Sequence, residues 1–130
     1  MVERNGEFQA TADPMKAIVS ILCFLISSSL FADDIEALKA KAEKGDARAQ
    51  NNLGYMYNYG RGAEKDFKEA VKWYRKAAKQ GDAKAQFNLG NMYEKGQGVL
   101  VDGKEAVKWY RKAAEQGNAF GQLKLGIMRL

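Results

Sequence analysis

The side chains that could do chemistry in most of this chain are carboxylates, lysines, arginines and tyrosines. After Ala32 the sequence contains no Ser, Thr, Cys, His or Pro. Residues 33–130 therefore exclude Ser–His and Cys–His nucleophilic catalysis, and zinc sites built from Cys and His. Glu64 and Glu94 are of the type that glycoside hydrolysis uses in pairs, but nothing in the sequence places them together. We interpret them as solvated surface charge and predict no catalytic residue, no metal site and no cofactor.

Glycine pairs at 60–62 and 96–98 have the Gly-x-Gly spacing of some phosphate-binding loops. Such a loop follows a strand and precedes Lys-Ser or Lys-Thr, and the sequence has neither feature at these positions. We expect instead that these glycines adopt positive φ in the turns between helices.

Two aromatic pairs with basic neighbours could be a platform for single-stranded nucleic acid. Trp73 and Tyr74 lie between Lys72 and Arg75, and the same pattern recurs at 108–112. Helical spacing places the aromatic residues on a buried stripe, while the basic residues point outwards. The pattern therefore predicts core aromatics beside a solvated basic ridge, and it predicts no nucleic acid partner.

These residues lie in a repeat with a period of 36 residues. Residues 45–80 and 81–116 agree at 25 of 36 positions, and a third copy begins at Gly117. A period of about 20 to 50 residues indicates a solenoid, because each unit is too small to bury its own apolar face and must stack on its neighbours. Function is therefore expected on a surface rather than in one enclosed pocket.

Each unit is predicted to form two helices, which we name helix A and helix B in chain order. Asp46 and Asp82 are the expected N-caps of the A helices, and Asp66 and Asp102 are those of the B helices. The segment 33–44 is in phase with the B helices and is expected to form an N-terminal cap. The predicted fold is an all-α, right-handed superhelix. Its helices are expected at 33–44, about 46–59, 66–80, 82–95, 102–116 and 118–129.

Apolar residues at helical spacing predict the buried faces. In helix A of the first unit they are Leu53, Met56 and Tyr57, and Gly54 is expected to let another backbone come close. Each of these residues recurs 36 positions later. The corresponding residues of helix B are Ala70, Trp73, Tyr74, Ala77 and Ala78.

The N-terminal part of the chain has the three parts of a secretory signal peptide. Lys16 precedes an apolar run, and small residues follow it up to Ala32, after which cleavage is expected. The signal peptide is thus predicted at 15–32, and the protein is predicted to be periplasmic or secreted. A membrane anchor is the alternative, but 17–31 is shorter than the roughly 20 residues of a spanning helix, so no stable anchor is expected after cleavage.

The polar segment 1–14 lies upstream of this complete signal. We therefore expect Met15 to be the true start and 1–14 to be a wrongly assigned extension; an unusually long charged region before the apolar run is the alternative. The whole chain carries a net charge of +5, and residues 33–130 remain basic. Such a charge attracts acidic proteins, envelope polyanions or anionic lipid headgroups.

The repeated strings resemble the Sel-1-like repeat family, a relative of the tetratricopeptide repeat. Two full units and a partial third at 117–130 carry the resemblance, which implies an α/α solenoid that acts as a non-catalytic scaffold for other proteins. The matching strings are Gly-Asp-Ala-Arg-Ala-Gln at 45–50, Leu53-Gly54 with Tyr57, Gly-Arg-Gly at 60–62 and Lys-Glu-Ala-Val-Lys-Trp-Tyr-Arg-Lys-Ala-Ala at 68–78, which recur at 81–86, 89–93, 96–98 and 104–114.

Two other functions are kept as alternatives to a protein-binding adaptor. Basic charge and aromatic residues would also suit a module that binds envelope glycan or peptidoglycan. A cysteine-rich branch of the resembled family is linked to β-lactam binding or hydrolysis, with disulfides joining paired helices. Because residues 33–130 contain no cysteine, a β-lactam-hydrolysing enzyme is the weakest of the three.

The positions at which the two full units differ predict a binding face. Within helix A they fall at spacings of three and four, which makes one face of the helix. Because stacking constrains the opposite face, we expect this one to line a concave groove for a protein or peptide partner; ordinary surface drift is the alternative. The expected groove residues are Arg48, Asn51, Tyr55, Asn58, Tyr59, Lys84, Phe87, Asn91, Glu94, Lys95, Phe120, Leu123 and Ile127.

The helix expected at 118–129 has too many apolar residues for one covered face. No helix B follows it in the sequence, and terminal repeats normally present a polar outer face. We therefore expect this helix to self-associate or bind a partner, or else to mark a truncated gene.

Overall fold

The structure is a computed structural model that describes residues 34–128. The predicted extension at 1–14, the signal peptide at 15–32 and its cleavage site after Ala32 lie outside the described residues. From Ile35 onwards the chain forms one compact unit. Within the described range, no helix has both the length and the apolar character that crossing a membrane requires.

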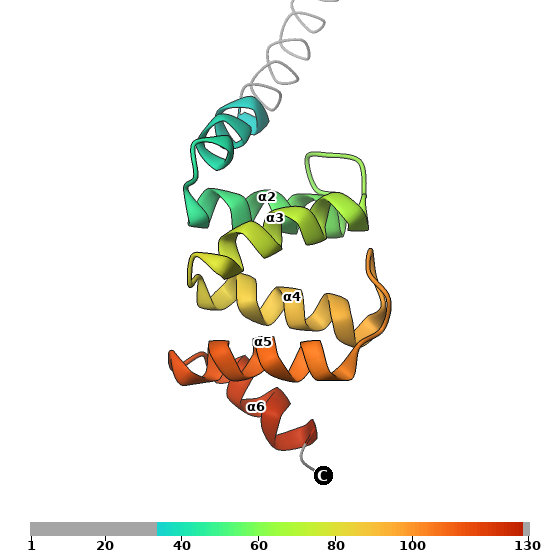
Figure 1. Cartoon of the computed structure of the whole chain (residues 1–130). Helices are drawn as coiled ribbons and strands as arrows, with labels where there is room; N and C mark the ends of the chain where they lie inside the picture. Colours follow the sequence, from blue (N-terminus) through green and yellow to red (C-terminus); the bar gives the residue numbers. More distant parts are fainter. Residues whose placement is uncertain (1–33, 129–130) are drawn as a thin grey trace, which may run out of the picture. The chain divides into compact units, whose positions relative to one another are not determined.

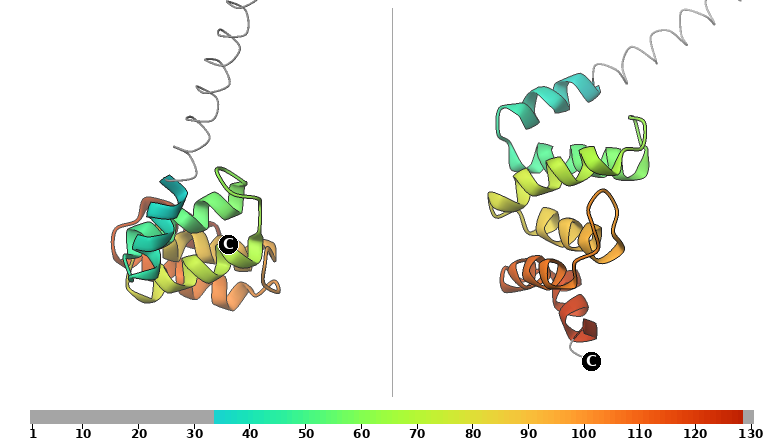
Figure 2. Two further views of the ribbon diagram at one scale, coloured as in Figure 1. Left: turned by 90° about the horizontal axis from the view of Figure 1, so that it is seen from above. Right: turned by 45° about the vertical axis from the view of Figure 1, so that its right-hand side comes forward.

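Every regular element of the described residues is a helix, which confirms the all-α fold. In Figures 1 and 2 the helices stack in chain order from the first helix at 34–43 down to α6. The labels α2, α4 and α6 belong to the A helices, and α3 and α5 to the B helices. The bounds are α2 Ala47–Tyr59, α3 Phe67–Lys79, α4 Ala83–Lys95, α5 Gly103–Glu115 and α6 Ala119–Met128.

Aspartate side chains start the helices at the predicted positions. Asp46 accepts a hydrogen bond from the backbone N–H of Ala49 at 2.9 Å, and Asp82 does the same one repeat later. Asp66 and Asp102 each accept from two backbone N–H groups of the following turn. Such caps satisfy N–H groups that have no partner within the helix.

Glycines end the A helices. Gly60 and Gly96 follow α2 and α4 with φ of 64° and 69°, the left-handed conformation that glycine adopts without strain. Gly62 and Gly98 also have positive φ. The prediction that these four are turn glycines is confirmed.

Within each unit, a tyrosine ring lies directly on a glycine of the facing helix. A Cβ added at Gly54 would lie 2.6 Å from Cδ1 of Tyr74, and one added at Gly90 would lie 2.6 Å from Cε1 of Tyr110. Both tyrosines are completely buried. The predicted close approach is therefore confirmed. At Gly54 the backbone oxygen of Ala70 also comes within 3.2 Å of the added Cβ, as predicted, but the nearest group at both glycines is an aromatic ring.

Between units, the tryptophans and a set of glutamines join one repeat to the next. Trp109 packs with α3 and α4, and Trp73 packs with the first helix and α2. The glutamine side chains at positions 50, 86 and 122 each donate to the carbonyl oxygen eight residues earlier, at 2.9, 3.1 and 3.2 Å. The recurrence of this bond shows that the three junctions are built alike.

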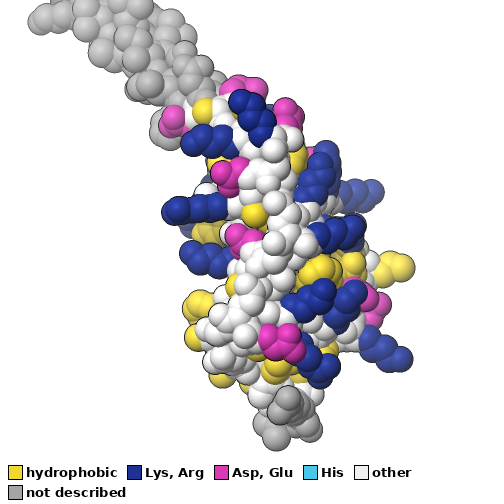
Figure 3. All heavy atoms as spheres, turned by 60° about the vertical axis from the view of Figure 1, so that its left-hand side comes forward, with side chains coloured by type: hydrophobic (Ala, Val, Ile, Leu, Met, Phe, Trp, Pro, Cys, Tyr) yellow, Lys and Arg dark blue, Asp and Glu magenta, His cyan; other side chains and the backbone are white. Residues whose placement is uncertain are grey.

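The basic residues beside the tryptophans do not all point away from the rings. The ammonium groups of Lys72 and Lys76 lie 5.1 and 4.7 Å from the centre of the Trp73 ring, and a second pair of lysines covers Trp109 in the same way. The lysine stems lie along the ring because each has both an apolar and a charged part. Both rings are only 6% exposed, so the predicted burial is confirmed. Figure 3 shows lysine and arginine side chains at both edges of the visible face of the stack, with acidic ones among them.

The contact between tyrosine and glycine can be tested by substitution. We expect Gly90→Ala to lower the free energy of unfolding by up to about 2 kcal/mol, because overpacking costs about 1–3 kcal/mol and alanine returns about 1 kcal/mol of helix propensity. Gly126 holds the same position in α6 but has no atom within 4 Å of an added Cβ. Gly126→Ala is therefore the matched control and should be neutral or stabilising. Equal losses in urea unfolding of the two variants would contradict this packing argument.

Candidate functional site

The candidate site is the face of the A helices that carries the thirteen predicted groove residues, which we name the A-helix face. Three contacts join successive A helices on it, and one of them is the ion pair between Glu94 and Lys124 that is described below. The side-chain amide of Asn88 donates to the Asn51 side-chain oxygen at 3.0 Å, which links α4 to α2. The rings of Phe87 and Phe120 lie 5.6 Å apart, which links α4 to α6. The residues that the sequence spaced 36 apart therefore lie on adjoining helices.

The predicted groove residues differ in how much of each side chain reaches solvent. Asn51 is buried, and its carbonyl oxygen is already used between α2 and α4. The half-buried members are Asn58, Phe87, Asn91 and Glu94, and the exposed ones are Arg48, Tyr55, Tyr59, Lys84, Lys95, Phe120, Leu123 and Ile127. Eight of the thirteen are therefore exposed and available to a partner.

Two tyrosines, Tyr55 and Tyr59, form an exposed aromatic pair on α2, which we name the tyrosine step. The rings of Tyr55 and Tyr59 are 4.5 Å apart and tilted by 46°, because residues four apart lie on the same side of a helix. They are 40% and 57% exposed. The guanidinium group of Arg61 lies 5.8 Å from the Tyr55 ring centre. The step therefore offers apolar area beside a positive charge.

An apolar cluster occupies the other end of the A-helix face. Phe87 lies between the rings of Tyr110 and Phe120, at 5.7 and 5.6 Å. Phe120, Leu123 and Ile127 on α6 are 64%, 62% and 57% exposed. The apolar surface predicted for this helix is confirmed. Among the described residues, no helix covers it.

Each buried tyrosine ring sends its hydroxyl group to the A-helix face. The Tyr74 hydroxyl accepts a hydrogen bond from the Asn58 amide at 3.3 Å. One repeat later the Tyr110 hydroxyl donates to the Glu94 carboxylate at 2.5 Å. Lys124 of α6 forms an ion pair with that same carboxylate at 3.1 Å. Both repeats therefore have a tyrosine at this position, but the first tyrosine bonds to a neutral amide and the second to a charged carboxylate.

These contacts shift the pKa values of the groups involved. The hydrogen bond from Tyr110 lowers the pKa of Glu94; partial burial opposes this effect, and Lys124 adds to the lowering. Burial raises the pKa of Tyr110, and its bond to Glu94 raises it further. Burial also raises the pKa of Tyr74. Both phenols therefore stay protonated, and Glu94 stays charged, near neutral pH.

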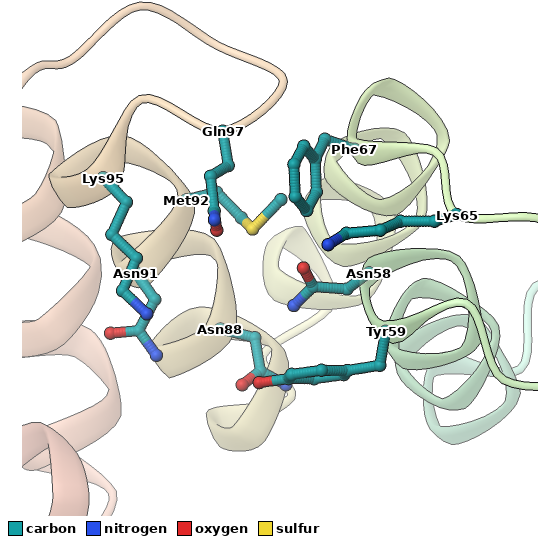
Figure 4. A pocket seen from close by; sticks show the side chains of 9 residues that line it. All are labelled: Asn58, Tyr59, Lys65, Phe67, Asn88, Asn91, Met92, Lys95 and Gln97. Atoms are coloured by element: carbon teal, nitrogen blue, oxygen red, sulfur yellow. The ribbon is translucent and has the colours of Figure 1, made fainter.

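A small cleft opens between α2 and α4, with a volume of about 110 Å³. Two lysines, Lys65 and Lys95, line it together with amide and aromatic side chains. Figure 4 shows Lys65 and Asn58 reaching from the α2 side of the cleft toward Asn88 and Met92 of α4. The remaining lining residues are Tyr59, Phe67, Asn91 and Gln97.

Sequence reasoning found only part of this cleft. Lys65 belongs to the loop and Phe67 to the start of helix B, so the spacing of variable residues along helix A does not include them. Both positions do differ between the two units, with Val101 and Gly103 as their counterparts. That difference was the available signal. Asn88 has the same residue, Asn52, at the equivalent position of the first unit, so comparing the two units does not single it out.

The chain is similar to proteins of one repeat family. The family model described as Sel1 repeat matches residues 47–82 and 83–118, more than half of the chain. The chain is also 53% identical over 44 residues to the secretory immunoglobulin A-binding protein EsiB of Escherichia coli. This match covers 34% of this chain and 9% of that protein.

Solved structures show the same likeness. A protective antigen present in uropathogenic Escherichia coli strains, with an SLR fold, has a TM-score of 0.71 and 46% identity over 72% of this chain and 20% of its own. A Sel1 repeat protein from Oxalobacter formigenes has a TM-score of 0.69 and 47% identity, covering 71% and 69%. Helicobacter pylori cysteine rich protein B has a TM-score of 0.64 and 29% identity, covering 67% and 65%. The chain thus spans a small part of both Escherichia coli relatives.

The network around Glu94 predicts a pH-dependent stability. Because the folded pKa of Glu94 lies below its ordinary value of 4.5, its stabilisation is complete above that value and is lost as the pH falls through the folded pKa. We expect Glu94→Gln to lower the free energy of unfolding by about 1 kcal/mol or less near neutral pH, because the ion pair is partly exposed.

Urea unfolding of parent and variant at about pH 7 and about pH 3 checks this expectation. The difference in their free energies of unfolding should become small at the lower pH. Glu115→Gln removes an exposed carboxylate that has no ion pair among the described residues, and it serves as the control. A gap that stays constant with pH would contradict the assignment.

Proposed function

The chain belongs to the Sel1 repeat family, and on this premise we propose that it is a non-catalytic scaffold that binds a protein or peptide partner along the A-helix face. Sel1 repeat proteins usually mediate interactions between proteins. The chain-specific part of the proposal is the surface that makes the contact. All thirteen groove residues belong to this proposed binding face, with Asn51 acting as a link between helices rather than as a contact.

The exposed pair of tyrosines on α2 carries the proposal. Tyr55 and Tyr59 present two rings to solvent, although the fold needs neither of them in its core. Tyrosine and arginine are enriched among the residues that dominate binding energy at protein interfaces. Their place beside Arg61 favours a partner with apolar and acidic groups.

EsiB is named for binding secretory immunoglobulin A, but this chain spans 9% of that protein. We propose protein binding alone for this chain. We further propose that it acts in the periplasm or outside the cell, because 15–32 has the parts of a signal peptide.

A glycan-binding module is the second candidate, and the same tyrosine step favours it. Aromatic rings beside a basic residue suit an anionic envelope glycan as well as a peptide. Binding of purified peptidoglycan that survives high salt and depends on Tyr55 and Tyr59 would favour this candidate. No observation favours a β-lactam-hydrolysing enzyme.

We also propose that a second copy of the chain covers α6. Its glycine at position 126 is exposed, whereas the equivalent glycines on α2 and α4 lie under tyrosine rings. Asp34 and Lys41 of the first helix hold the positions that Ala70 and Ala77 hold in α3, and both of those alanines are completely buried. Burying these charges would be costly, so the first helix of another copy is a poor cover for α6. Symmetric pairing of two α6 helices avoids that cost.

Capture from an envelope extract tests the binding face. We expect the parent protein to retain a specific protein, identified by mass spectrometry, and Tyr55→Ala/Tyr59→Ala to retain at least about tenfold less of it. Leu100→Ala/Val101→Ala removes two exposed apolar side chains from the loop before α5 and should bind like the parent. Equal retention by both variants would refute the tyrosine step as the contact.

Sedimentation over a range of concentrations tests the pairing of α6. We expect the parent to approach a dimer and Leu123→Lys to stay monomeric, because a charge at the centre of an apolar contact opposes association. Leu100→Lys, at a 90% exposed loop position, controls for added charge. A parent that stays monomeric at the highest concentration that remains in solution would refute the pairing.

A further inference from the structure

We infer that the cleft between α2 and α4 is a subsite for the carboxylate of an acidic side chain on the bound partner. This inference rests on the proposed scaffold function and specifies one contact within it. The partner segment is one in which a glutamate or aspartate enters the cleft while a neighbouring apolar residue packs on the tyrosine step.

The lining of the cleft carries positive charge, although Lys95 also lies near enough to Glu94 to help lower the pKa of that carboxylate. Lys65 and Lys95 line it, and no aspartate or glutamate does. Neither lysine belongs to an ion pair within the range that the structure describes. Lys65 is held over the Phe67 ring, 4.8 Å from its centre, which keeps its charge at the edge of the cleft. The site therefore attracts an anion.

The next junction along the stack shows which anion fits this geometry. Glu94 holds the position of Asn58 one repeat later, and Lys124 holds that of Asn88. Those two side chains pair at 3.1 Å, so the junction of α4 and α6 supplies its own carboxylate. The junction of α2 and α4 has two neutral amides at the same positions. A carboxylate from a partner, bound beside these amides, would supply the negative charge that Glu94 supplies one repeat later.

The amides around the cleft are suited to hold such a group. The NH₂ groups of Asn58 and Asn88 each keep one N–H besides the bond that they donate to Tyr74 and to Asn51. Asn91 uses its side-chain oxygen to accept from Tyr110, which leaves its NH₂ group as a donor. These N–H groups can donate to a carboxylate oxygen, and the lysines add charged donors. The volume of about 110 Å³ admits a small planar group rather than a whole peptide. The cleft is therefore an anchor for one side chain, while the rest of the partner lies outside it.

The cleft is continuous with the tyrosine step. Tyr59 lines the cleft and also stacks on Tyr55. A partner residue anchored in the cleft would therefore place its neighbours on exposed aromatic surface. This continuity is the reason for assigning the carboxylate to a peptide segment rather than to a free anion.

Nuclear magnetic resonance titration of the protein, isolated after expression of the full reading frame, tests the subsite directly. The probe is N-acetyl-glutamate methylamide, and its glutamine analogue is the neutral control. We expect saturable shifts of the side-chain amide signals of Asn58, Asn88 and Asn91 with the glutamate probe alone, at a Kd of about millimolar order. No saturable shift, or equal shifts with the two probes, would overturn the inference.

Three variants separate a specific site from general charge attraction. Lys65→Gln/Lys95→Gln should weaken binding of the probe at least about tenfold. Asn58→Glu/Asn88→Lys copies the ion pair of the next junction, so it should fold and should abolish binding. Lys44→Gln/Lys79→Gln removes the same charge from exposed positions outside the cleft and should change nothing. Equal weakening by the two lysine pairs would overturn the inference, as would tighter binding of inorganic phosphate than of the glutamate probe.

A captured partner distinguishes this inference from the proposed function. If the partner requires Tyr55 and Tyr59 but binds Asn58→Glu/Asn88→Lys as well as it binds the parent, the scaffold function stands and the carboxylate subsite is refuted. If the variant loses the partner while its helical content is unchanged, both stand. If the glutamate probe binds but no protein is captured, the subsite stands and the scaffold function fails.

Discussion

In both complete repeats, one buried tyrosine ring lies on a bare glycine of the facing helix. An added Cβ at either glycine would lie 2.6 Å from a ring carbon, so the two helices can pack at this distance only without a side chain there. The ring fills the space between helix A and helix B, and its hydroxyl group bonds to a side chain of the A-helix face. The same residue thus holds the repeat together and fixes a residue of the surface that we propose as the binding site.

The two complete repeats use this shared frame to present different surfaces. Tyr74 meets an amide at the A-helix face, whereas Tyr110 meets a carboxylate that is paired with a lysine. The helix caps, the tyrosine contacts and the glutamine bonds between repeats are the same in both. A difference of one or two residues on helix A therefore changes the charge of a junction while the packing beneath it stays constant. In a solenoid, the surface residues of a repeat can therefore vary for binding while the residues that pack the repeats stay the same.

The ends of the described stack are not equivalent. The first helix has Asp34 and Lys41 where the repeats bury alanine, so its outer side is polar. The last helix exposes Phe120, Leu123 and Ile127. Charged residues at a terminal helix prevent further stacking, whereas exposed apolar residues favour it. The described stack therefore has a polar surface at its first helix and an apolar surface at its last helix.

The sequence by itself determined the repeat, its two helices, the capping aspartates and most of the core. These features follow from local rules, namely the 36-residue period, the capping preference of aspartate and the spacing of apolar residues along one helix. It also placed the variable residues on one face of helix A, because helical geometry alone decides which residues share a face. The signal peptide remains a prediction from the sequence, since 15–32 lies outside the described residues.

Only the tertiary structure decided which side chains meet across helices. The amides of Asn88 and Asn51 are 37 positions apart, and Lys65 reaches the cleft from a loop, so no local spacing could pair them. The same holds for the ring that fills the space at Gly54 and for the lysines that cover Trp73, because their placement depends on how closely neighbouring helices pack. Local sequence sets the shape of one helix. The distance and rotation between helices, which create the cleft and its charge, arise from packing among residues far apart in the chain.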